Sequence, residues 1–169
     1  SGQLIGAIAA LRNITENRKA QQALQDSEEK YRNIIESIED GYFEVDLAGN
    51  FTFFNPWLIK VLGYSTEELK GQSYRLIMDE KNQRKIYEAF NRVYKTGQSV
   101  KGLDWQVLKK DGTNLFVETT VLPIKDQTRV VGFKGIVHDI SERKQAEEAL
   151  RQSENLYRTI FETTGTATI

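Results

Sequence analysis

The chain has 169 residues, a formal net charge of −1 and 28% charged residues. This balance of charges provides no basic surface for nucleic acid or for an anionic membrane. The sequence contains no cysteine, which excludes disulfides, thiolate metal sites and thiol nucleophiles and is compatible with a reducing cytoplasm.

An apolar run occupies residues 4–11 near the start of the chain. It is too short to span a bilayer, and it lacks the basic start and the cleavage site of a signal peptide. We therefore expect a cytoplasmic segment that makes no membrane contact. Residues 166–169 carry no helix-ending signal, and we interpret the chain as an excerpt of a longer protein.

Two stretches of the chain repeat one another at a fixed offset. When Ile14 is aligned with Ile140, the matching residues are Glu16 with Glu142, Ala20 with Ala146, Leu24 with Leu150, Ser27 with Ser153, Tyr31 with Tyr157, and Ile34 with Ile160. Self-similarity at a fixed period marks a tandem array. We therefore divide the chain into the last strand and end of a preceding module (1–15), a connecting helix (16–38), a complete module (39–141), a second connecting helix (142–162) and the start of a following module (163–169).

Both connectors are predicted to be long amphipathic helices. Neither contains proline or glycine, and their apolar positions step by three or four residues along one face. Such a face suits either packing on the module's own sheet or a coiled-coil seam between two chains. The candidates for a homodimer interface are Ala20, Leu24, Tyr31, Ala146, Leu150 and Tyr157.

The stretch from Gly41 to Gly71 predicts a β-hairpin followed by two short helices. Residues 42–45 and 51–54 are rich in β-prone side chains, and the turn formers Asp46, Gly49 and Asn50 separate them. Asn55 and Pro56 then fit the first positions of a helix that Gly63 ends. Ser65 or Thr66 begins the next helix, and Gly71 closes it.

The remainder of the module predicts one longer helix and three strands. After an irregular turn or helix at residues 73–78, Asp79 can cap a helix over 80–95, with Ile86, Phe90 and Val93 as its inward stripe. Strands are expected over 100–109, 113–124 and 130–140, with Lys110-Asp111-Gly112 as the first turn between them. This order indicates an α+β domain with helices on one face of an antiparallel sheet.

These elements carry motifs that resemble the PAS sensory domains. The matching residues are Asp46, Gly49, Asn55, Gly63-Tyr64-Ser65, Glu67-Glu68-Leu69, Gly71, Lys110-Asp111-Gly112 and Asp139-Ile140-Ser141-Glu142-Arg143. The resemblance covers Gly41 to about Arg143. It implies a five-stranded antiparallel sheet whose first strand lies beside the last, with the long N- and C-terminal amphipathic helices flanking the domain. PAS relatives bind haem, flavin, small acids or nothing on this one scaffold.

The cofactors of the family can be tested against individual residues. Haem-binding relatives supply a histidine from the long helix, and residues 80–95 contain none. The light-sensing flavin relatives use a cysteine, which this chain lacks. A noncovalently held flavin would need aromatic partners such as Trp57 and Trp105, although Trp57 stands where relatives commonly carry alanine and would fill part of the cavity. We therefore expect either no cofactor or an unidentified small organic molecule.

A ligand pocket is expected between the inner face of the sheet and the helices. Alternate residues of a strand line one face of a sheet, and pockets in such folds are mostly apolar. The candidates are Phe43, Val45, Phe51, Phe53, Asn55, Trp57, Trp105 and Val121. Asn55 is the best polar residue to orient a ligand, and it is also the expected cap of the helix that starts at Pro56.

The junction between the last strand and the second connector is the expected signalling output. Ser141 can cap the connector helix, and Glu142 suits its positive end. The resemblance implies that Asp139 and Arg143 form a polar latch that couples the core to the outgoing helix. In the first copy of the repeat Asn13 and Asn17 stand at these positions, so that junction would lack the charge pair.

Catalysis has little support in the sequence. His138 is the only histidine, and no neighbouring nucleophile is indicated. The glycines near Gly132 and Gly135 do not follow a phosphate-binding spacing. We expect neither catalysis nor a metal site in this segment.

The sequence therefore predicts a sensory and dimerisation PAS module that relays a signal through its flanking helices. The expected parent is a two-component sensor histidine kinase, whose neighbouring PAS and kinase domains would be partners in the same chain. Two alternatives stay open: a structural relay that binds no ligand, and a flavin-binding redox sensor.

Overall fold

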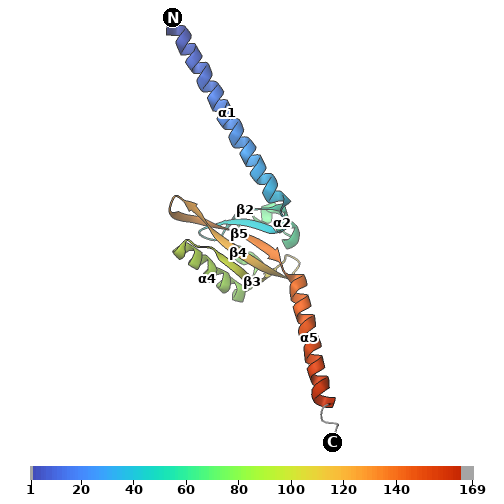
Figure 1. Cartoon of the computed structure of the whole chain (residues 1–169). Coiled ribbons are helices and arrows are strands. Elements are labelled where there is room, and N and C mark those ends of the chain that lie inside the picture. The colour runs from blue at the N-terminus through green and yellow to red at the C-terminus, as the bar shows by residue number, and fades with distance from the viewer. Residues whose placement is uncertain (1, 165–169) are drawn as a thin grey trace. The chain divides into compact units, whose positions relative to one another are not determined.

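The computed structural model describes residues 2–164 (Figure 1). The chain forms two units, one within residues 1–38 and the other within residues 39–169. The first unit is the single helix α1 (Gly2–Ser37). No described helix is long and apolar enough to cross a membrane.

The expectation of a strand end within residues 1–15 is wrong, because α1 is helical from Gly2 onward. A strand must share its backbone N–H and C=O groups with a neighbouring strand. In the described chain the sheet contains only strands from the second unit, so these residues form hydrogen bonds within a helix instead. The predicted start of a following module at residues 163–169 lies almost wholly outside the described residues.

The second unit contains a five-stranded antiparallel sheet in the order β2-β1-β5-β4-β3. The predicted pairing of the first strand with the last is confirmed. The strands are β1 (Gly41–Asp46), β2 (Phe51–Phe54), β3 (Val100–Leu108), β4 (Asn114–Asp126) and β5 (Arg129–Asp139). Because β1 and β5 are central, the two ends of the module meet in the middle of the sheet.

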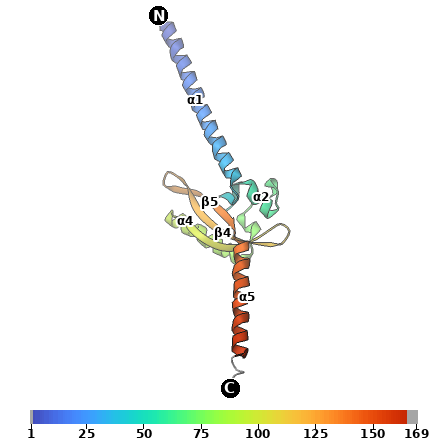
Figure 2. The ribbon, with the colours of Figure 1, turned by 45° about the vertical axis from the view of Figure 1, so that its right-hand side comes forward.

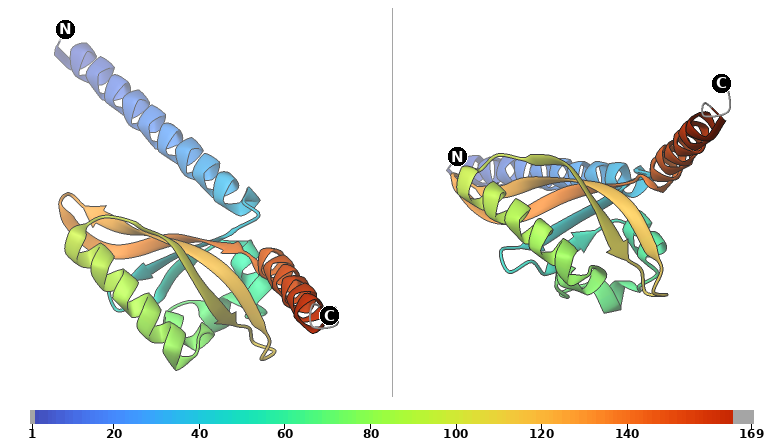
Figure 3. Two further views of the ribbon diagram at one scale, coloured as in Figure 1. Left: turned by 60° about the horizontal axis from the view of Figure 1, so that its bottom comes forward. Right: turned by 90° about the horizontal axis from the view of Figure 1, so that it is seen from below.

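Helices follow the hairpin β1-β2 and cover one face of the sheet, where α4 lies against β3 and β4 (Figure 3). They are α2 (Pro56–Leu62), α3 (Thr66–Leu69), the 3₁₀ helix η1 (Tyr74–Ile77) and α4 (Glu80–Thr96). The helix α5 (Ser141–Thr164) follows directly from β5 (Figure 2). These observations confirm the predicted α+β class with flanking helices.

Side-chain caps fix where the short helices begin. The Asn55 side chain accepts from the N–H of Leu58 ahead of Pro56, and Asp79 caps α4 in the same way. Ser65 and Glu68 form a reciprocal capping box at α3. Each cap satisfies backbone donors that a helix cannot pair internally, so the boundaries match those read from the sequence.

A β-bulge in β2 changes which of its aromatic residues face the core. Phe51 pairs with Val45 and Phe53 pairs with Glu44, so Thr52 has no partner across the pair. This extra residue breaks the alternation of the strand. Phe51 is buried, whereas Phe53 is 37% exposed.

The core lies between the inner face of the sheet and the helices. Its least exposed side chains, below 2% relative exposure, are Val45, Asn55, Leu62, Leu69, Val93, Val107, Val117, Thr119 and Val121. Burial of these apolar groups contributes about 1.5–3 kcal/mol for each full side chain. Two members of this set, Asn55 and Thr119, are polar, so their hydrogen bonds are important for stability.

Candidate functional site

A small cavity lies inside the core, bounded by the five strands of the sheet on one side and by α2, η1 and α4 on the other. It measures about 30 Å³, which exceeds the roughly 10–15 Å³ that one water requires. Pockets for drug-sized ligands are at least about ten times larger. The lining residues are Phe43, Phe51, Leu58, Tyr74, Ile77, Met78, Ile86, Phe90, Trp105, Val107, Thr119, Val121 and Val137.

The structure brings half of the predicted pocket residues to this cavity. Phe43, Phe51, Trp105 and Val121 line it. The other four candidates are not among its lining residues: Val45, Phe53, Asn55 and Trp57. The placement of Phe53 follows from the bulge in β2, which turns its ring to the outer face.

Asn55 is a structural bridge between α2 and β1. Its Oδ1 accepts from the N–H groups of Tyr42 (3.0 Å) and Leu58 (3.3 Å), and its Nδ2 donates to the carbonyl of Asp40 (2.8 Å). The side chain is completely buried. It therefore joins the start of α2 to the start of β1, as its expected capping role requires.

Sequence reasoning missed the cavity wall that η1 provides. Tyr74, Ile77 and Met78 are each 5% exposed and line the cavity. The segment is too short for a periodic pattern to show which face is buried. The inward stripe of α4 does indicate part of the cavity wall, because two of its residues, Ile86 and Phe90, line the cavity.

One buried hydrogen bond crosses the sheet beside the cavity. The indole Nε1–H of Trp105 on β3 donates to the hydroxyl oxygen of Thr119 on β4, at 2.8 Å. Thr119 is 1% exposed and Trp105 is 7% exposed. This bond fixes the orientation of the indole against the cavity, since an unpaired buried donor would be costly.

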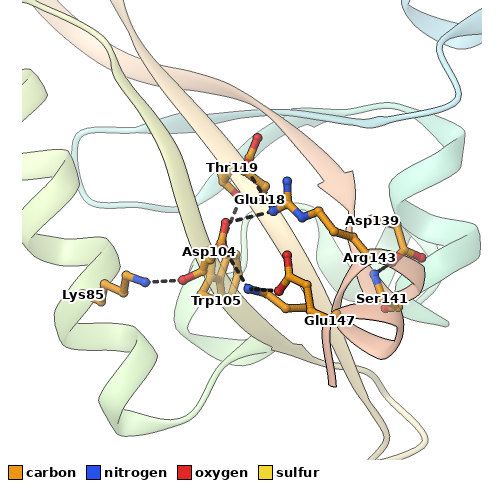
Figure 4. A network of polar contacts seen from close by, with 10 residues as sticks. Lys85, Asp104, Trp105, Glu118, Thr119, Asp139, Ser141, Arg143 and Glu147 are labelled. Atoms are coloured by element: carbon orange, nitrogen blue, oxygen red, sulfur yellow. Dashed lines mark hydrogen bonds and ion pairs between the residues drawn. The ribbon is translucent and has the colours of Figure 1, made fainter. Parts of the chain in front are cut away.

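The residues next to this pair hold the first turn of α5 on the opposite face of the sheet (Figure 4). A guanidinium nitrogen of Arg143 lies 3.3 Å from Glu118 and 3.5 Å from Asp104. Nζ of Lys144 lies 3.1 Å from Asp104 and 3.5 Å from Glu147. The carboxylates of Asp104 and Glu118 are the strand side of this ionic cluster, which we call the helix tether.

Electrostatics within the helix tether favour the charged form of its lysine. The hydrogen bond to Asp104 is the main cause that raises the pKa of Lys144; burial lowers this pKa, and the negative charges of Glu147 and Asp104 raise it. A second lysine reaches the same strand from the helical side, because Nζ of Lys85 on α4 donates to the carbonyl oxygen of Asp104.

The predicted latch between Asp139 and Arg143 is corrected by these contacts. The Asp139 carboxylate accepts from the N–H of Ser141 at 2.8 Å, while Arg143 pairs with β3 and β4. Ser141 is the first residue of α5 rather than its cap. The aspartate is held in a local turn, because a carboxylate two residues before a free N–H readily closes such a turn.

His138 contacts an acid, but the surroundings do not form a catalytic arrangement. Its Nδ1 lies 2.6 Å from the Asp40 carboxylate, and the imidazole is 61% exposed. Across residues 2–164, no group of three or more histidine, aspartate or glutamate side chains is placed to hold a metal ion. The contact links the residue before β1 to the end of β5.

Comparison with known proteins identifies the family. The family model described as "PAS fold" matches residues 29–140. The chain belongs to the PAS family.

Curated relatives of this PAS domain include signalling kinases. The chain is 27% identical over 135 residues to the signal transduction histidine-protein kinase AtoS of Escherichia coli, a match that covers 80% of the chain and 22% of AtoS. It is 28% identical over 154 residues to sporulation kinase E of Bacillus subtilis, which covers 89% of the chain and 20% of that kinase. The chain thus spans about a fifth of the length of these relatives, and its similarity to them supports a role in signal sensing within two-component systems.

Solved structures show the same fold. The PAS domain of a protein from Colwellia psychrerythraea matches with a TM-score of 0.62 and 23% identity, over 68% of this chain and 97% of that one. The LOV protein of Rhodobacter sphaeroides matches with a TM-score of 0.60 and 15% identity, over 75% of this chain and 73% of that one. At these identities the likeness establishes the fold of the PAS domain.

The candidate dimer residues all lie on exposed helix surfaces. Leu24 and Tyr31 on α1 are 61% and 54% exposed, and Leu150 and Tyr157 on α5 are 62% and 63% exposed. The two alanines of the set, Ala20 and Ala146, are exposed as well. The three candidates on α5, Ala146, Leu150 and Tyr157, therefore do not pack on the sheet of their own PAS domain.

Proposed function

We propose that this PAS domain is a sensory module in which strands β3 and β4 carry a change in the core cavity to helix α5. One arrangement supports the proposal: Trp105 and Thr119 line the cavity, while their sequence neighbours Asp104 and Glu118 hold the first turn of α5 from the opposite face. Successive residues of a strand point to opposite faces, so a shift of the strand moves both sets together.

The register of the two strands makes this coupling direct. Asp104 pairs with Glu118 across β3 and β4, and Leu103 pairs with Thr119. Two carboxylates opposite one another repel, and the cations of α5 neutralise them. A signal that changes the spacing of β3 and β4 therefore changes how well Arg143 bridges the two acids. Such a switch requires two arrangements of similar free energy, which a ligand would bind differently.

Matched substitutions on β4 test this coupling. Thr119→Val keeps the shape of the side chain but removes the acceptor of the Trp105 N–H. Thr120→Val makes the same chemical change on the neighbouring residue, which is outside the lining of the cavity. We expect Thr119→Val to speed amide hydrogen exchange in residues 141–147 and Thr120→Val to leave it near the wild-type rate. Equal rates in the two variants would show that the cavity and α5 are not coupled through β4.

The occupant of the cavity is proposed to be an uncharged small molecule or none. No charged residue is among those that line the cavity. The volume of about 30 Å³ favours the second candidate function, a structural relay without a ligand. The flavin hypothesis loses one of its two supporting aromatic residues, because Trp57 is not among the lining residues. Native mass spectrometry of the purified protein separates the candidates: a retained extra mass supports the sensor, and a clean apo mass supports the relay.

We also propose that the helices form a parallel homodimer seam. Along α5, Ala146, Leu150, Ser153, Tyr157 and Ile160 alternate steps of four and three residues, the spacing of a coiled-coil seam. Leu150→Asp should lower the fraction of dimer in sedimentation equilibrium. Asn155→Asp adds the same charge outside the seam and should leave the dimer intact. If Leu150→Asp leaves the fraction of dimer unchanged, the dimer contact does not include Leu150.

The parent protein is proposed to be a sensor histidine kinase with further PAS and kinase domains. The similarity to AtoS and to sporulation kinase E supports this assignment. Incubation of the full-length protein with ATP should produce a phosphorylated histidine outside the PAS domain. Failure of the full-length protein to autophosphorylate would contradict the kinase assignment without affecting the coupling proposed for α5.

A further inference from the structure

A surface groove lies between the β1-β2 turn, η1 and α4. It measures about 310 Å³, against about 30 Å³ for the inner cavity. Pockets for drug-sized ligands begin at about 300 Å³, so the groove has room for a small organic molecule. Its lining residues are Leu47, Ala48, Gly49, Tyr74, Arg75, Tyr87, Phe90, Asn91, Tyr94 and Phe133.

Three buried aromatic rings form the floor of the groove. Phe90 stacks on Phe133 with a centroid distance of 4.7 Å and an interplanar angle of 1°. The ring of Tyr74 meets Phe90 edge-on at 5.0 Å and 86°. Each of these side chains is at most 6% exposed. Aromatic floors of this kind suit a planar apolar group, because rings prefer offset-stacked and edge-to-face contacts.

Hydrogen bonds within the chain hold the three sides of the groove in place. The N–H of Tyr74 on η1 donates to the carbonyl of Gly49 in the β1-β2 turn, at 2.9 Å. The side-chain amide of Gln83 on α4 donates to the carbonyls of Arg75 and Met78, at 3.4 and 3.3 Å. The groove is therefore preformed, and a preformed site retains more of its contact energy as affinity.

Two half-exposed tyrosines on α4 line one wall of the groove. Tyr87 and Tyr94 are 52% and 53% exposed. Two turns of helix separate them by about 10 Å, and Asn91 lies between them on the same face. The amide of Asn91 forms no hydrogen bond with another residue of the described chain. This wall can therefore contact a molecule about 10 Å long and pair with one polar group on it.

Arg75 is the only charged residue among those that line the groove. Its guanidinium lies 5.9 Å from the centroid of the Tyr74 ring, and within residues 2–164 it forms no ion pair. The acid of the β1-β2 turn, Asp46, is not a lining residue. Its carboxylate instead accepts from the N–H and the side-chain amide of Asn50, at 2.8 and 2.9 Å. The groove thus carries one positive charge that no acid on its walls neutralises.

We propose that the groove binds a small organic molecule with one carboxylate on a planar apolar body. A guanidinium matches a carboxylate through two parallel hydrogen bonds, so Arg75 holds the charged end. The body lies on the aromatic floor beside Tyr87 and Tyr94, and Asn91 bonds a polar substituent. The inference goes beyond the proposed relay, because the site opens at the surface and contains no residue of the helix tether.

Hydrocinnamate is the probe for the test, because it has one phenyl ring on a short arm that ends in a carboxylate. Titration of the isotope-labelled protein at neutral pH, up to about 10 mM probe, should shift the amide NMR signals of Gly49, Arg75 and Asn91 to saturation. Hydrocinnamamide has nearly the same shape without the charge. It should bind about tenfold more weakly, because hydrogen bonds to an ionised group are the stronger ones.

Matched arginine substitutions test the source of the affinity. Arg75→Gln should weaken hydrocinnamate binding about tenfold and leave hydrocinnamamide binding unchanged. Arg84→Gln removes the same charge from a residue of α4 that pairs with Glu88 and does not line the groove, and should bind like the wild type. Arg75→Lys keeps the charge without the planar fork and should have intermediate affinity.

Three outcomes would overturn the site. The first is the absence of saturable shifts at the groove residues of the wild type. The second is equal affinity for the acid and the amide, which would show that the charge plays no part. The third is an equal loss in Arg75→Gln and Arg84→Gln, which would show a general attraction of anions. The spectrum of each variant without probe checks that the fold is intact.

The test is independent of the proposed relay. Its signals come from the groove, whereas the coupling through β4 is measured by amide exchange in residues 141–147. Failure of the carboxylate site therefore leaves the coupling tested by Thr119→Val standing. Equal exchange in Thr119→Val and Thr120→Val would likewise leave the carboxylate site standing.

Discussion

Asp104 and Glu118 face one another across β3 and β4, and both carboxylates bind the guanidinium of Arg143. Without the cation, two like charges would remain opposite one another on adjacent strands, an arrangement that is unfavourable. The attachment of α5 to the sheet is therefore electrostatic at its first turn, in addition to the backbone bond from Ile140 to Phe116 (2.9 Å).

Arg143→Ala should loosen the first turn of α5 while the core stays folded. Exposed ion pairs contribute only about 0.2–1 kcal/mol each, so the midpoint of urea unfolding should change little. Amide exchange in residues 141–147 should become several-fold faster. Arg151→Ala is the control, because Arg151 pairs with Glu148 within α5 itself. If both variants exchange alike, the tether to β3 and β4 has no role in holding the helix.

Asn55→Ala should be among the most destabilising substitutions on the helical side of the core. It removes the cap of α2 and leaves the buried N–H of Tyr42 and the partly buried carbonyl of Asp40 without this partner. We expect a loss of about 2–4 kcal/mol in the free energy of unfolding, measured by urea denaturation. Ser65→Ala, which removes the cap of an exposed helix, should cost about 1 kcal/mol. A similar loss of unfolding free energy in the two variants would mean that the hydrogen bonds from Asn55 toward β1 contribute nothing to stability.

Gly49→Ala and Gly112→Ala separate backbone strain from contact with the Tyr74 ring. Both glycines have positive φ, +86° and +82°, but only Gly49 has atoms of Tyr74 within reach of an added Cβ. An alanine in the left-handed conformation costs about 1–2 kcal/mol. The free energy of unfolding of Gly112→Ala should fall by only that amount. The free energy of unfolding of Gly49→Ala should fall by clearly more, because the Tyr74 ring must shift to make room for the new Cβ. Thermal denaturation measures both, and equal losses would show that the ring moves without cost.

Asp46 should make the stability of the PAS domain depend on acid pH. Burial raises the pKa of Asp46, but hydrogen bonds from Asn50 and from the N–H groups of Ala48 and Gly49 together hold it below its ordinary value of 3.8. A carboxylate with a lowered folded pKa stabilises the fold fully above the unfolded pKa, and this contribution is lost as pH falls through the folded pKa.

Asp46→Asn tests that contribution directly. The variant retains one acceptor oxygen but loses the charge and the second acceptor for Asn50. Its free energy of unfolding should be lower than that of the wild type at pH 7, by about 1 kcal/mol. The difference should shrink as the pH falls below 3.8. A difference that stays constant over this range would assign the effect to shape rather than to charge.

Local chemistry made much of the fold predictable from the sequence. Asn55 and Pro56 indicate the start of α2, and Lys110-Asp111-Gly112 indicates the turn between β3 and β4. Both signals are local, because caps and turns depend on neighbouring residues. The β2 bulge was not visible, since a bulge depends on which residue of the partner strand is opposite. Strict alternation along β2 therefore predicts that Phe53 faces the core, whereas the bulge places it on the outer face.

The helix tether shows why the candidate site was harder to predict than the fold. Arg143 pairs with residues 25 and 39 positions earlier in the chain, counted from Glu118 and Asp104. Proximity in the sequence favours Asp139 as the partner of Arg143. The strand register instead places Glu118 and Asp104 beside the guanidinium. Such pairing depends on the lateral alignment of strands, which periodicity within one segment does not encode.

The tether acts at one end of a long rigid element. Helix α5 has 24 residues, which corresponds to a rod of about 36 Å at 1.5 Å per residue. A tilt of about 10° at the first turn would displace the far end by about 6 Å, a distance close to one helical turn. In the proposed relay the helix would act as a lever arm, because sub-ångström adjustments of Asp104 and Glu118 at its first turn would become a displacement of several ångström at its far end.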